Sequence, residues 1–275
     1  MDPFSIGFIG GGNMARSLAG GLVDSGWAPA RIRIAEPAAD KREALTGMLG
    51  VACTAENPAV AEWADVLVLA VKPQVLHKVC DAIAAAVQSR RPLVVSIAAG
   101  VRSNDIERWL GGNLPVVRVM PNTPALVGSG ASALFANAQV SAGQRDRAES
   151  ILRAVGVTAW LDDEPLMDAV TALSGSGPAY FFLLMEAIED AGRELGLDAD
   201  TARLLTLETA FGAAKLALES DDSPAELRRR VTSPGGTTEA ALAALEQGGL
   251  REVVARALRA AADRGRSLAD RLGAA

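Results

Sequence analysis

Two segments rich in glycine, serine, threonine and proline interrupt the helical pattern in the second half of the chain. They read LSGSGPAY at residues 173–180 and VTSPGGTTEAAL at residues 231–242. Glycine lets a ligand approach the backbone closely, and hydroxyls and N–H groups at a helix start bind a polar or anionic group. The segments therefore predict a site for a small anionic molecule. A structural alternative is a helix break capped by Ser176 and a turn capped by Thr237.

A third chemical signal lies near the N-terminus, in the sequence FIGGGNMARSLAGG. Gly10, Gly12 and Ala15 have the spacing GxGxxA, directly after an apolar strand pattern and before a helical one. In this context the first glycine permits a tight turn, the second leaves room for a pyrophosphate, and the alanine permits close packing of helix on strand. The motif predicts a dinucleotide-binding loop, with a glycine-rich tight turn as the alternative.

The kind of dinucleotide depends on the end of the second predicted strand, RIRIAE, which places Glu36 there. A carboxylate at this position would bind the 2′-hydroxyl of the adenosine ribose and repel a 2′-phosphate, which favours NADH. The distance from Gly10 exceeds the usual spacing of roughly 20 residues, and Lys41 or Arg42 could bind a phosphate instead. An ordinary surface acid is a further alternative for Glu36. Asn57 is expected near the adenosine or, equally, as a helix cap before a proline.

The elements that must position these residues alternate between strand and helix up to about residue 162. Strands are expected at residues 5–9, 31–35, 65–71, 92–98 and 115–120, with helices at 13–25, 40–49, 74–87 and 104–110. Continuous Val, Ile and Leu indicate strands covered on both faces, as in a doubly wound parallel sheet. Runs at 131–136 and 158–161 flank a helix at 144–155 and would extend the sheet, in a direction that the sequence leaves open. Residues 1–162 are thus expected to form a Rossmann NAD(P)-binding domain in an α/β fold.

After residue 162 no strand pattern remains, and residues 163–275 are expected to form an all-α domain. The predicted helices span residues 164–171, 179–195, 200–219, 223–231, 237–247 and 250–272. Their Ala- and Leu-rich faces offer more apolar surface than one small bundle can bury, so we infer a second copy of the chain as partner. This domain is expected to serve dimerisation and substrate binding.

Composition limits the remaining choices of partner and location. The 275 residues include 27 Lys and Arg against 33 Asp and Glu, for a net charge of -6. That balance argues against nucleic acid or an anionic membrane as the main partner. Cys53 and Cys80 lie far apart without a CxxC or a histidine cluster, so neither a disulfide framework nor a metal site is expected. No export signal or membrane span is recognisable, which favours the cytoplasm.

Taken in order, the motifs resemble those of the pyrroline-5-carboxylate reductases over almost the whole chain. They read FIGGGNMA, AVKPQ, SIAAG, VMPNTP, DAVTALSGSGPAY and RRRVTSPGGTTEAAL, and the last two distinguish this family from Rossmann reductases in general. The resemblance implies reduction of L-1-pyrroline-5-carboxylate to L-proline with NADPH or NADH, the last step of proline biosynthesis. It also implies a helical domain interleaved with that of a second chain, and often a ring of five such dimers.

Together with the motifs, the resemblance assigns two groups of site residues. The cofactor group comprises Ile9, Gly10, Gly12, Asn13, Met14, Ala15, Glu36, Asn57, Val71, Lys72, Pro73, Ser96, Ile97, Ala98, Met120, Pro121 and Asn122, the last three at the reaction centre. The substrate group comprises Glu164, Ser176, Gly177, Ser233, Gly235, Gly236, Thr237 and Thr238. Family members that prefer NADPH tend to have small or hydroxyl residues after the second strand, so Glu36 is a departure that puts an NADPH preference in doubt.

One residue is expected to take part in the chemistry itself. The substrate is a cyclic imine with a carboxylate, and its nitrogen is basic enough to take up a proton without a strong acid, so one hydroxyl contact suffices. Thr238 is the candidate for that contact, with the N–H groups from Gly235 to Thr238 as a carboxylate-binding nest. His77 and Lys72 invite acid/base roles, but packing and cofactor contact are the preferred interpretations.

Two other functions stay open on the sequence alone. A β-hydroxyacid dehydrogenase or a broader imine reductase would share a Rossmann domain followed by helices, although its substrate loops would need a signature other than TSPGGTT. A dinucleotide-sensing regulator would bind the cofactor without turnover. Assays on pyrroline-5-carboxylate and on hydroxyacids separate the three possibilities.

Overall fold

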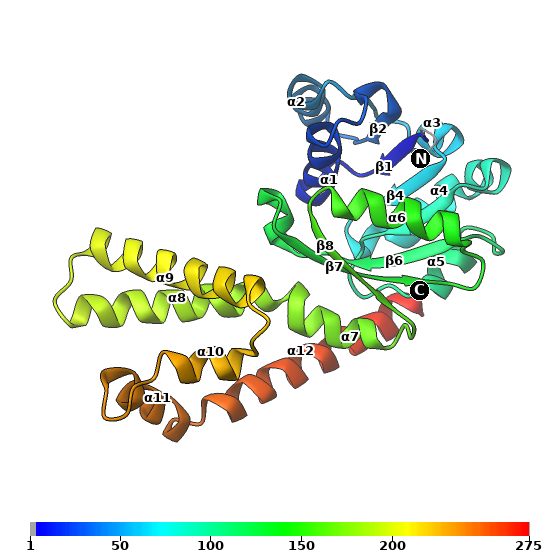
Figure 1. Ribbon diagram of the computed structural model, residues 1–275. Coiled ribbons are helices and arrows are strands. Elements are labelled where there is room, and N and C mark those ends of the chain that lie inside the picture. Colours follow the sequence, from blue (N-terminus) through cyan, green and yellow to red (C-terminus); the bar gives the residue numbers. More distant parts are fainter. Residues whose placement is uncertain (1–3, 275) are drawn as a thin grey trace. The chain divides into compact units, whose positions relative to one another are not determined.

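The computed structural model describes residues 4–274, which fall into two compact units (Figure 1). The first comprises the chain up to Ser176 together with the segment from Ala260 onward, and the second is Gly177–Arg259. The expected fold class, an N-terminal Rossmann fold followed by helices, is confirmed. The division of function between residues 1–162 and 163–275 stays a prediction.

The first unit is built on an 8-stranded sheet, in the order β3-β2-β1-β4-β5-β6-β7-β8. The strands are β1 (Ile6–Ile9), β2 (Ile32–Ala35), β3 (Ala52–Thr54), β4 (Val66–Leu69), β5 (Leu93–Ser96), β6 (Val116–Met120), β7 (Gly130–Ala136) and β8 (Gly156–Leu161). All neighbouring strands run parallel except β6 and β7. The strand order reverses between β1 and β4, and open α/β sheets bind ligands at such a point, beyond the carboxyl ends of the strands.

The link between β6 and β7 explains the one antiparallel pair, a direction that the sequence left open. A short 3-10 helix, η2 (Thr123–Val127), joins the two strands. A parallel crossover needs about a dozen residues or more, so this link returns the chain in the opposite direction. The helix α6 (Ala142–Arg153) then supplies a true crossover, and β8 accordingly pairs parallel to β7.

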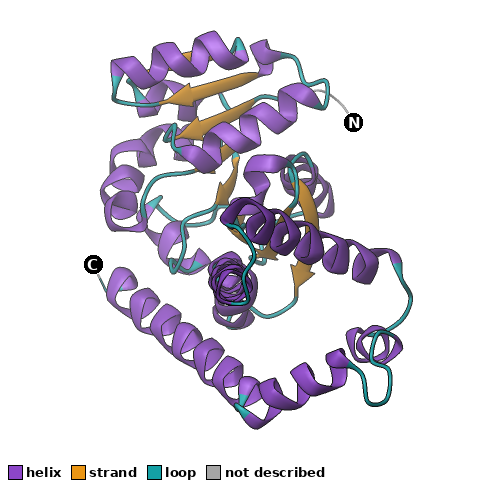
Figure 2. Ribbon diagram, turned by 90° about the vertical axis from the view of Figure 1, so that its left-hand side faces the viewer, coloured by secondary structure: helices purple, strands orange, loops and turns teal. Residues whose placement is uncertain are grey.

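Apolar side chains cover both faces of the sheet. Every residue of β1, β4 and β5 is buried. Phe8 and Val68 belong to one core, and Ile9 and Leu69 belong to a second core on the opposite face. Figure 2 shows helices on both sides of the strands. Because neighbouring residues of a strand point to opposite faces, the central strands need apolar residues at every position, as the sequence pattern predicted.

Helices fill the connections between the parallel strands. They are α1 (Asn13–Asp24), the 3-10 turn η1 (Pro29–Arg31), α2 (Ala39–Leu49), α3 (Asn57–Trp63), α4 (Pro73–Arg90) and α5 (Ser103–Trp109). The strand β3 was not expected from the sequence, and the helix α3 was expected only as the alternative in which Asn57 caps a helix. The strand has 3 residues, all at least partly exposed, and the helix has 7, so neither produces a long periodic pattern.

Residues 177–259 form helices and turns only. The helices are α8 (Gly177–Glu194), α9 (Ala199–Glu219), α10 (Pro224–Arg230), α11 (Thr237–Gln247) and the first part of α12 (Leu250–Gly273). Large apolar side chains on α8 and α9 are exposed, among them Phe181, Phe182, Leu183 and Phe211. Monomers rarely expose so much apolar surface, so this face has the character of a protein interface. Within residues 4–274, no helix is both long and apolar enough to cross a membrane.

The segment LSGSG does not interrupt the helical path, so the expected break there is wrong. The helix α7 (Leu166–Val170) runs directly into a π-helical turn, η3 (Thr171–Gly175), and α8 follows from Gly177. Ser176 has helical dihedral angles and donates its N–H to the carbonyl of Thr171, so it ends η3 as its C-terminal cap and is not the expected N-terminal cap of α8. π-helical turns are rare and occur frequently at functional sites.

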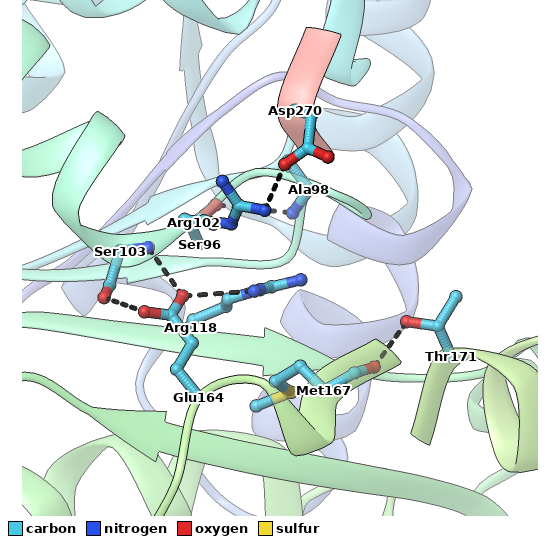
Figure 3. A network of polar contacts seen from close by, with 9 residues as sticks. All are labelled: Ser96, Ala98, Arg102, Ser103, Arg118, Glu164, Met167, Thr171 and Asp270. Atoms are coloured by element: carbon cyan, nitrogen blue, oxygen red, sulfur yellow. Dashed lines mark hydrogen bonds and ion pairs between the residues drawn. The ribbon is translucent and has the colours of Figure 1, made fainter. Parts of the chain in front are cut away.

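The end of α12 belongs to the first unit. Asp270 pairs with Arg102 (Figure 3), and Arg108 donates to the carbonyl of Gly273 at 2.8 Å. The hydrogen bond to Asp270 raises the pKa of the Arg102 guanidinium above its usual value. The chain therefore returns to the Rossmann unit after the helical one, which the helical pattern of residues 250–272 did not predict.

Candidate functional site

The glycine loop after β1 has the geometry of a dinucleotide site. Gly10 has φ +100°, and a Cβ there would lie 2.8 Å from the carbonyl oxygen of Ala70, so glycine is required. At Gly12 a Cβ would meet nothing within 4 Å, which leaves open space at the start of α1. Gly12 caps α1 without a side-chain hydrogen bond, so no capping side chain competes for the N–H groups of Asn13 and Met14. This arrangement fits a pyrophosphate.

Contacts of α1 fix this loop relative to the end of β6. Ala15 is 1% exposed and packs in the core beneath the loop. Ser17 Oγ donates to the carbonyl of Ala125 at 2.6 Å, within the turn η2 that follows the MPN sequence. A direct hydrogen bond thus joins the helix that follows the predicted pyrophosphate loop to the turn that follows the predicted reaction centre.

Glu36 follows β2 and lies beside the glycine loop, where a ribose-binding carboxylate is expected. It is 7% exposed, so the interpretation as an ordinary surface acid is wrong. One carboxylate oxygen accepts the N–H of Gly11 at 3.0 Å, and the other accepts the N–H of Ala38 at 3.1 Å. Arg42 donates to the main-chain carbonyls of Glu36 and Pro37, which places its guanidinium at the loop after β2. The protein therefore orients this carboxylate by itself, and its contact with the ribose stays a prediction.

The remaining cofactor segments follow the carboxyl ends of neighbouring strands. A Cβ on Gly10 would lie 3.0 Å from Cγ1 of Val71, so the loops after β1 and β4 are in contact. Ser96 is fully buried, and its Oγ accepts the N–H of Ala98 at 3.4 Å. The same edge of the sheet carries the other predicted cofactor residues of this group, namely Ile9, Asn57, Pro73, Ile97 and Pro121. The fold thus brings the cofactor group to one edge, while each individual contact stays a prediction.

The end of β6 meets the π-helical turn at this edge. The Asn122 Oδ1 accepts the N–H of Ala131 at 2.9 Å, and the Nδ2 donates to the main-chain carbonyl of Ser174 at 3.2 Å. Met120 contacts Gly175 so closely that a Cβ at residue 175 would clash with the Met120 Cε. The structure therefore brings the MPN and SGSG sequences together, although some fifty residues separate them in the chain.

Glu164, predicted to contact the substrate, is engaged in a polar network of the first unit (Figure 3). Its carboxylate accepts the N–H and the hydroxyl of Ser103 at 2.7 and 2.6 Å, and it pairs with Nη1 of Arg118 at 3.1 Å. Ser103 is the first residue of α5, and a helix start stabilises negative charge. These contacts give Glu164 a structural role in joining α5 and β6, and its contact with substrate stays a prediction.

The segment TSPGGTT lies in the second unit and bonds to residues nearby in the sequence. Gly235 has φ +71° and donates its N–H to Oε2 of Glu239 at 2.7 Å. Gly236 donates its N–H to the carbonyl of Ser233 at 3.0 Å. Of the N–H groups expected to form a carboxylate nest, the two glycine groups are therefore bonded within the chain in this structure.

The helix α11 begins directly after these glycines. Thr237 is its first residue and Gly236 is its cap, so the interpretation of Thr237 as the cap is wrong. The N–H groups of the first helical residues have no partner inside a helix, which leaves those of Thr237 and Thr238 for a ligand or water. Thr238 is half-buried. In the first segment, Ser176 and Gly177 lie where η3 passes into α8, and Gly177 is buried.

Three residues with alternative interpretations take ordinary structural positions. His77 stacks on Trp109 with ring centroids 4.6 Å apart, which agrees with packing. Lys72 is the exposed cap residue of α4. Asn57 is the first residue of α3, and the cap is Glu56, so the cap interpretation of Asn57 is wrong by one position. The cofactor contacts of Lys72 and Asn57 stay predictions.

Sequence reasoning missed two side chains that hold predicted site residues, although each left a signal. Glu239 stands three positions after the cap of α11, the spacing at which a carboxylate commonly reaches back to the start of a helix. Arg118 is a charged residue within the apolar strand VVRVM, and a buried arginine needs an acidic partner. That partner is Glu164.

These features define a class of protein. A glycine loop that opens a helix at the switch point of a parallel sheet, with a carboxylate after the next strand, is the site of a nicotinamide-dependent oxidoreductase. Residues 5–100 match the family described as NADP oxidoreductase coenzyme F420-dependent, and residues 164–268 match the family pyrroline-5-carboxylate reductase dimerisation. The chain belongs to the pyrroline-5-carboxylate reductase family.

Several relatives resemble the chain over its full length. Pyrroline-5-carboxylate reductase of Pseudomonas aeruginosa is 54% identical and covers 99% of this chain and 100% of its own. The structure of a pyrroline-5-carboxylate reductase from Coxiella burnetii has a TM-score of 0.93 and 47% identity, over 97% of this chain and 99% of that one. A pyrroline carboxylate reductase from Plasmodium falciparum, described with NADP bound, has a TM-score of 0.87 and 30% identity, over 98% and 99%. The resemblance seen in the motifs is confirmed.

Proposed function

We propose that the protein reduces L-1-pyrroline-5-carboxylate to L-proline with NADPH or NADH, as the last step of proline biosynthesis. The observation that carries this proposal is the 54% identity, over the full length, to a protein named pyrroline-5-carboxylate reductase. The open space at Gly12 and the oriented carboxylate of Glu36 fit a dinucleotide. When bound, the nicotinamide supplies the hydride for the imine carbon.

The chain's own residues then have to bind and orient the substrate. The imine nitrogen takes up its proton before reduction, so a hydroxyl contact is sufficient, and the Thr238 side chain is our candidate for it. The N–H groups of Thr237 and Thr238, at the start of α11, would hold the substrate carboxylate. The Gly235 N–H would join them only after Glu239 releases it.

We also propose that Glu36 shifts the cofactor preference toward NADH. Its carboxylate is buried and oriented at the glycine loop, where it would accept a ribose hydroxyl and repel a 2′-phosphate. Arg42 offers the opposing influence, because its guanidinium lies at the loop after β2 that carries Glu36. The balance between these two charges would set how well NADPH is tolerated.

For the assembly, we propose a cytoplasmic homodimer that can build a ring of five dimers, with neither nucleic acid nor membrane as partner. The apolar side chains exposed on α8 and α9 support a dimer formed by the helical unit. The net charge of -6 supports the absence of a polyanionic partner. Light scattering at micromolar concentration tests the assembly, and a monomer would contradict it.

The function is tested by measuring nicotinamide oxidation in the presence of different substrates. We expect saturable turnover with pyrroline-5-carboxylate, and none with a panel of β-hydroxyacids and their oxidised forms. Turnover on the hydroxyacid panel alone would indicate a dehydrogenase instead. Cofactor binding without turnover of any of them would indicate a regulator.

A further inference from the structure

One carbonyl of the π-helical turn η3 has lost its α-helical donor because of a proline. In an α-helix the carbonyl of residue i accepts the N–H of residue i+4. For Ser174 that residue is Pro178, which has no N–H. Ser174 is half-buried, and an unpaired main-chain carbonyl shielded from water is unfavourable. The sequence SGSGP therefore removes the α-helical donor of this carbonyl and leaves it open to a donor from elsewhere in the structure.

Asn122 provides that donor. Its Nδ2 donates to the Ser174 carbonyl at 3.2 Å, while its Oδ1 accepts the N–H of Ala131, the second residue of β7, at 2.9 Å. Both polar atoms of the Asn122 amide are therefore bonded, the nitrogen as donor and the oxygen as acceptor. It connects the end of β6 and the start of β7 to the turn that carries Ser176.

A close contact holds the same turn from a second direction. A Cβ at Gly175 would clash with Cε of Met120, the residue two positions before Asn122. Within η3, Ala172 is 2% exposed, so the turn is packed as well as bonded. The turn η3 therefore contacts the MPN sequence at the end of β6 through Met120 as well as through Asn122.

We infer that Asn122 is a positioning residue for the reaction, which replaces the N–H missing from Pro178 and so fixes Ser176 against the end of β6. The inference gives Asn122 a different task from the cofactor contact that the family resemblance implies. Its link to catalysis rests on the proposed function. A displacement of about 1 Å in a positioning group can lower a rate substantially, so loss of this hydrogen bond should affect kcat.

Asn122→Asp removes the hydrogen-bond donor of this side chain and keeps the acceptor. A carboxylate keeps an oxygen for the Ala131 N–H and cannot donate to the Ser174 carbonyl. We expect kcat with pyrroline-5-carboxylate to fall about tenfold, while the Kd for NADH, measured by fluorescence titration, stays within about twofold. A Kd that rises as much as kcat falls would show that Asn122 acts through the cofactor, and would overturn the inference.

Pro178→Ala gives the decisive comparison, because it restores the missing N–H. In that background Asn122→Asp should lower kcat by less than about threefold, since the main chain can now satisfy Ser174 itself. Equal losses in both backgrounds would overturn the inference. If Asn122→Asp alone fails to fold, the double variant should fold, and failure of both would also overturn it.

Asn137→Asp is the matched control at the other end of β6. The Asn137 Oδ1 accepts the N–H of Val116 at 3.0 Å, and its Nδ2 donates to the carbonyl of Leu114 at 2.9 Å and to Oε2 of Glu107 at 3.1 Å. Asp at this position also places a carboxylate beside Glu107, so the control is the harsher of the two changes. Asn137 performs the same bridging without touching η3, so kcat should stay within about twofold. A tenfold loss here would show that any weakened bridge in the sheet lowers turnover, which would overturn the inference.

Hydrogen exchange separates this inference from the proposed function. Amides of residues 171–177 should exchange about tenfold faster in Asn122→Asp than in the wild type, and at nearly the wild-type rate in the double variant. If the wild type does not reduce pyrroline-5-carboxylate, the proposed function fails, and exchange still decides whether Asn122 replaces the proline N–H. Unchanged exchange in Asn122→Asp would overturn the inference.

Discussion

The two Gly/Ser/Pro segments have similar composition and different structures. LSGSG continues the helical path as a π turn, held by Asn122 and packed on Met120. TSPGGTT separates α10 from α11, is largely exposed, and bonds to Ser233 and Glu239 within its own stretch of sequence. Glycine and proline in a segment predict that regular helical hydrogen bonds are lost there. Contacts with distant parts of the chain then determine whether the segment forms a fixed turn, as in LSGSG, or an exposed loop, as in TSPGGTT.

The largest effect is expected in the exposed segment. Thr238→Val should lower kcat about 100-fold, because the proposed hydroxyl contact to the substrate nitrogen is lost, while the Kd for NADH is kept. Thr232→Val is the control in the same segment, since its hydroxyl bonds to the Arg228 carbonyl, and it should change kcat by less than about twofold. Steady-state rates measure both. A Thr238→Val variant with at least half of the wild-type kcat would show that the Thr238 hydroxyl takes no part in the reaction.

The stability of the π turn in LSGSG should be sensitive to added side-chain volume. Gly175→Ala adds a Cβ against Cε of Met120, the flexible end of a side chain that has to move aside, so we expect a loss of about 1 kcal/mol or less in the free energy of unfolding and a several-fold lower kcat. Gly47→Ala in α2 is the control, because a Cβ there meets nothing within 4 Å, and it should stabilise by about 0.5–1 kcal/mol. Chemical denaturation compares the two. Equal stability changes would show that the π turn is not tightly packed.

The preference between NADH and NADPH should depend on the glycine loop of the first unit and not on LSGSG or TSPGGTT. Glu36→Ala removes the buried carboxylate at the glycine loop and should raise kcat/KM for NADPH relative to NADH about tenfold. Asp40→Ala, an exposed acid in the first turn of α2, serves as control and should leave the ratio unchanged within about twofold. An unaltered ratio in Glu36→Ala would show that this carboxylate does not select the cofactor.

The smallest effect concerns Glu239. Glu239→Gln keeps an oxygen for the Gly235 N–H and removes a negative charge beside the proposed carboxylate site, so KM for pyrroline-5-carboxylate should fall roughly threefold with little change in kcat. Glu246→Gln, near the other end of α11, should leave KM as it is. If KM is the same in all three proteins, substrate does not bind at this end of the helix.

The sequence predicted the central strands and the glycine loop, whose structures depend on residues within the segment itself. The apolar runs gave the central strands, and GxGxxA gave the loop at Gly10 and Gly12, because both signals reflect backbone requirements of the segment itself. The end of α12 packing beside Arg102 was not predicted, since helical periodicity does not reveal which surface a helix contacts. The antiparallel β7 depended on the short link η2, whose length limits the possible connections.

For the candidate site, the sequence offered a set of residues and no hydrogen bonds between them. The family motifs selected Asn122 and Glu164 as contacts of ligands, and the structure gives both of them bonds within the protein. Their partners, Ser174 and Ser103, lie far away in the sequence, so no spacing rule connects them. Two signals of these distant contacts, namely the missing N–H of Pro178 and the charged Arg118 within an apolar strand, were present in the sequence and were not used to predict them.

The most direct test of the account is to quantify the product. The protein is incubated with pyrroline-5-carboxylate and NADH, and L-proline formed is compared with cofactor oxidised. The account predicts equal amounts of the two, with the same result at a different rate when NADPH replaces NADH. Oxidation of the cofactor without formation of proline, or no oxidation with either cofactor, would contradict it.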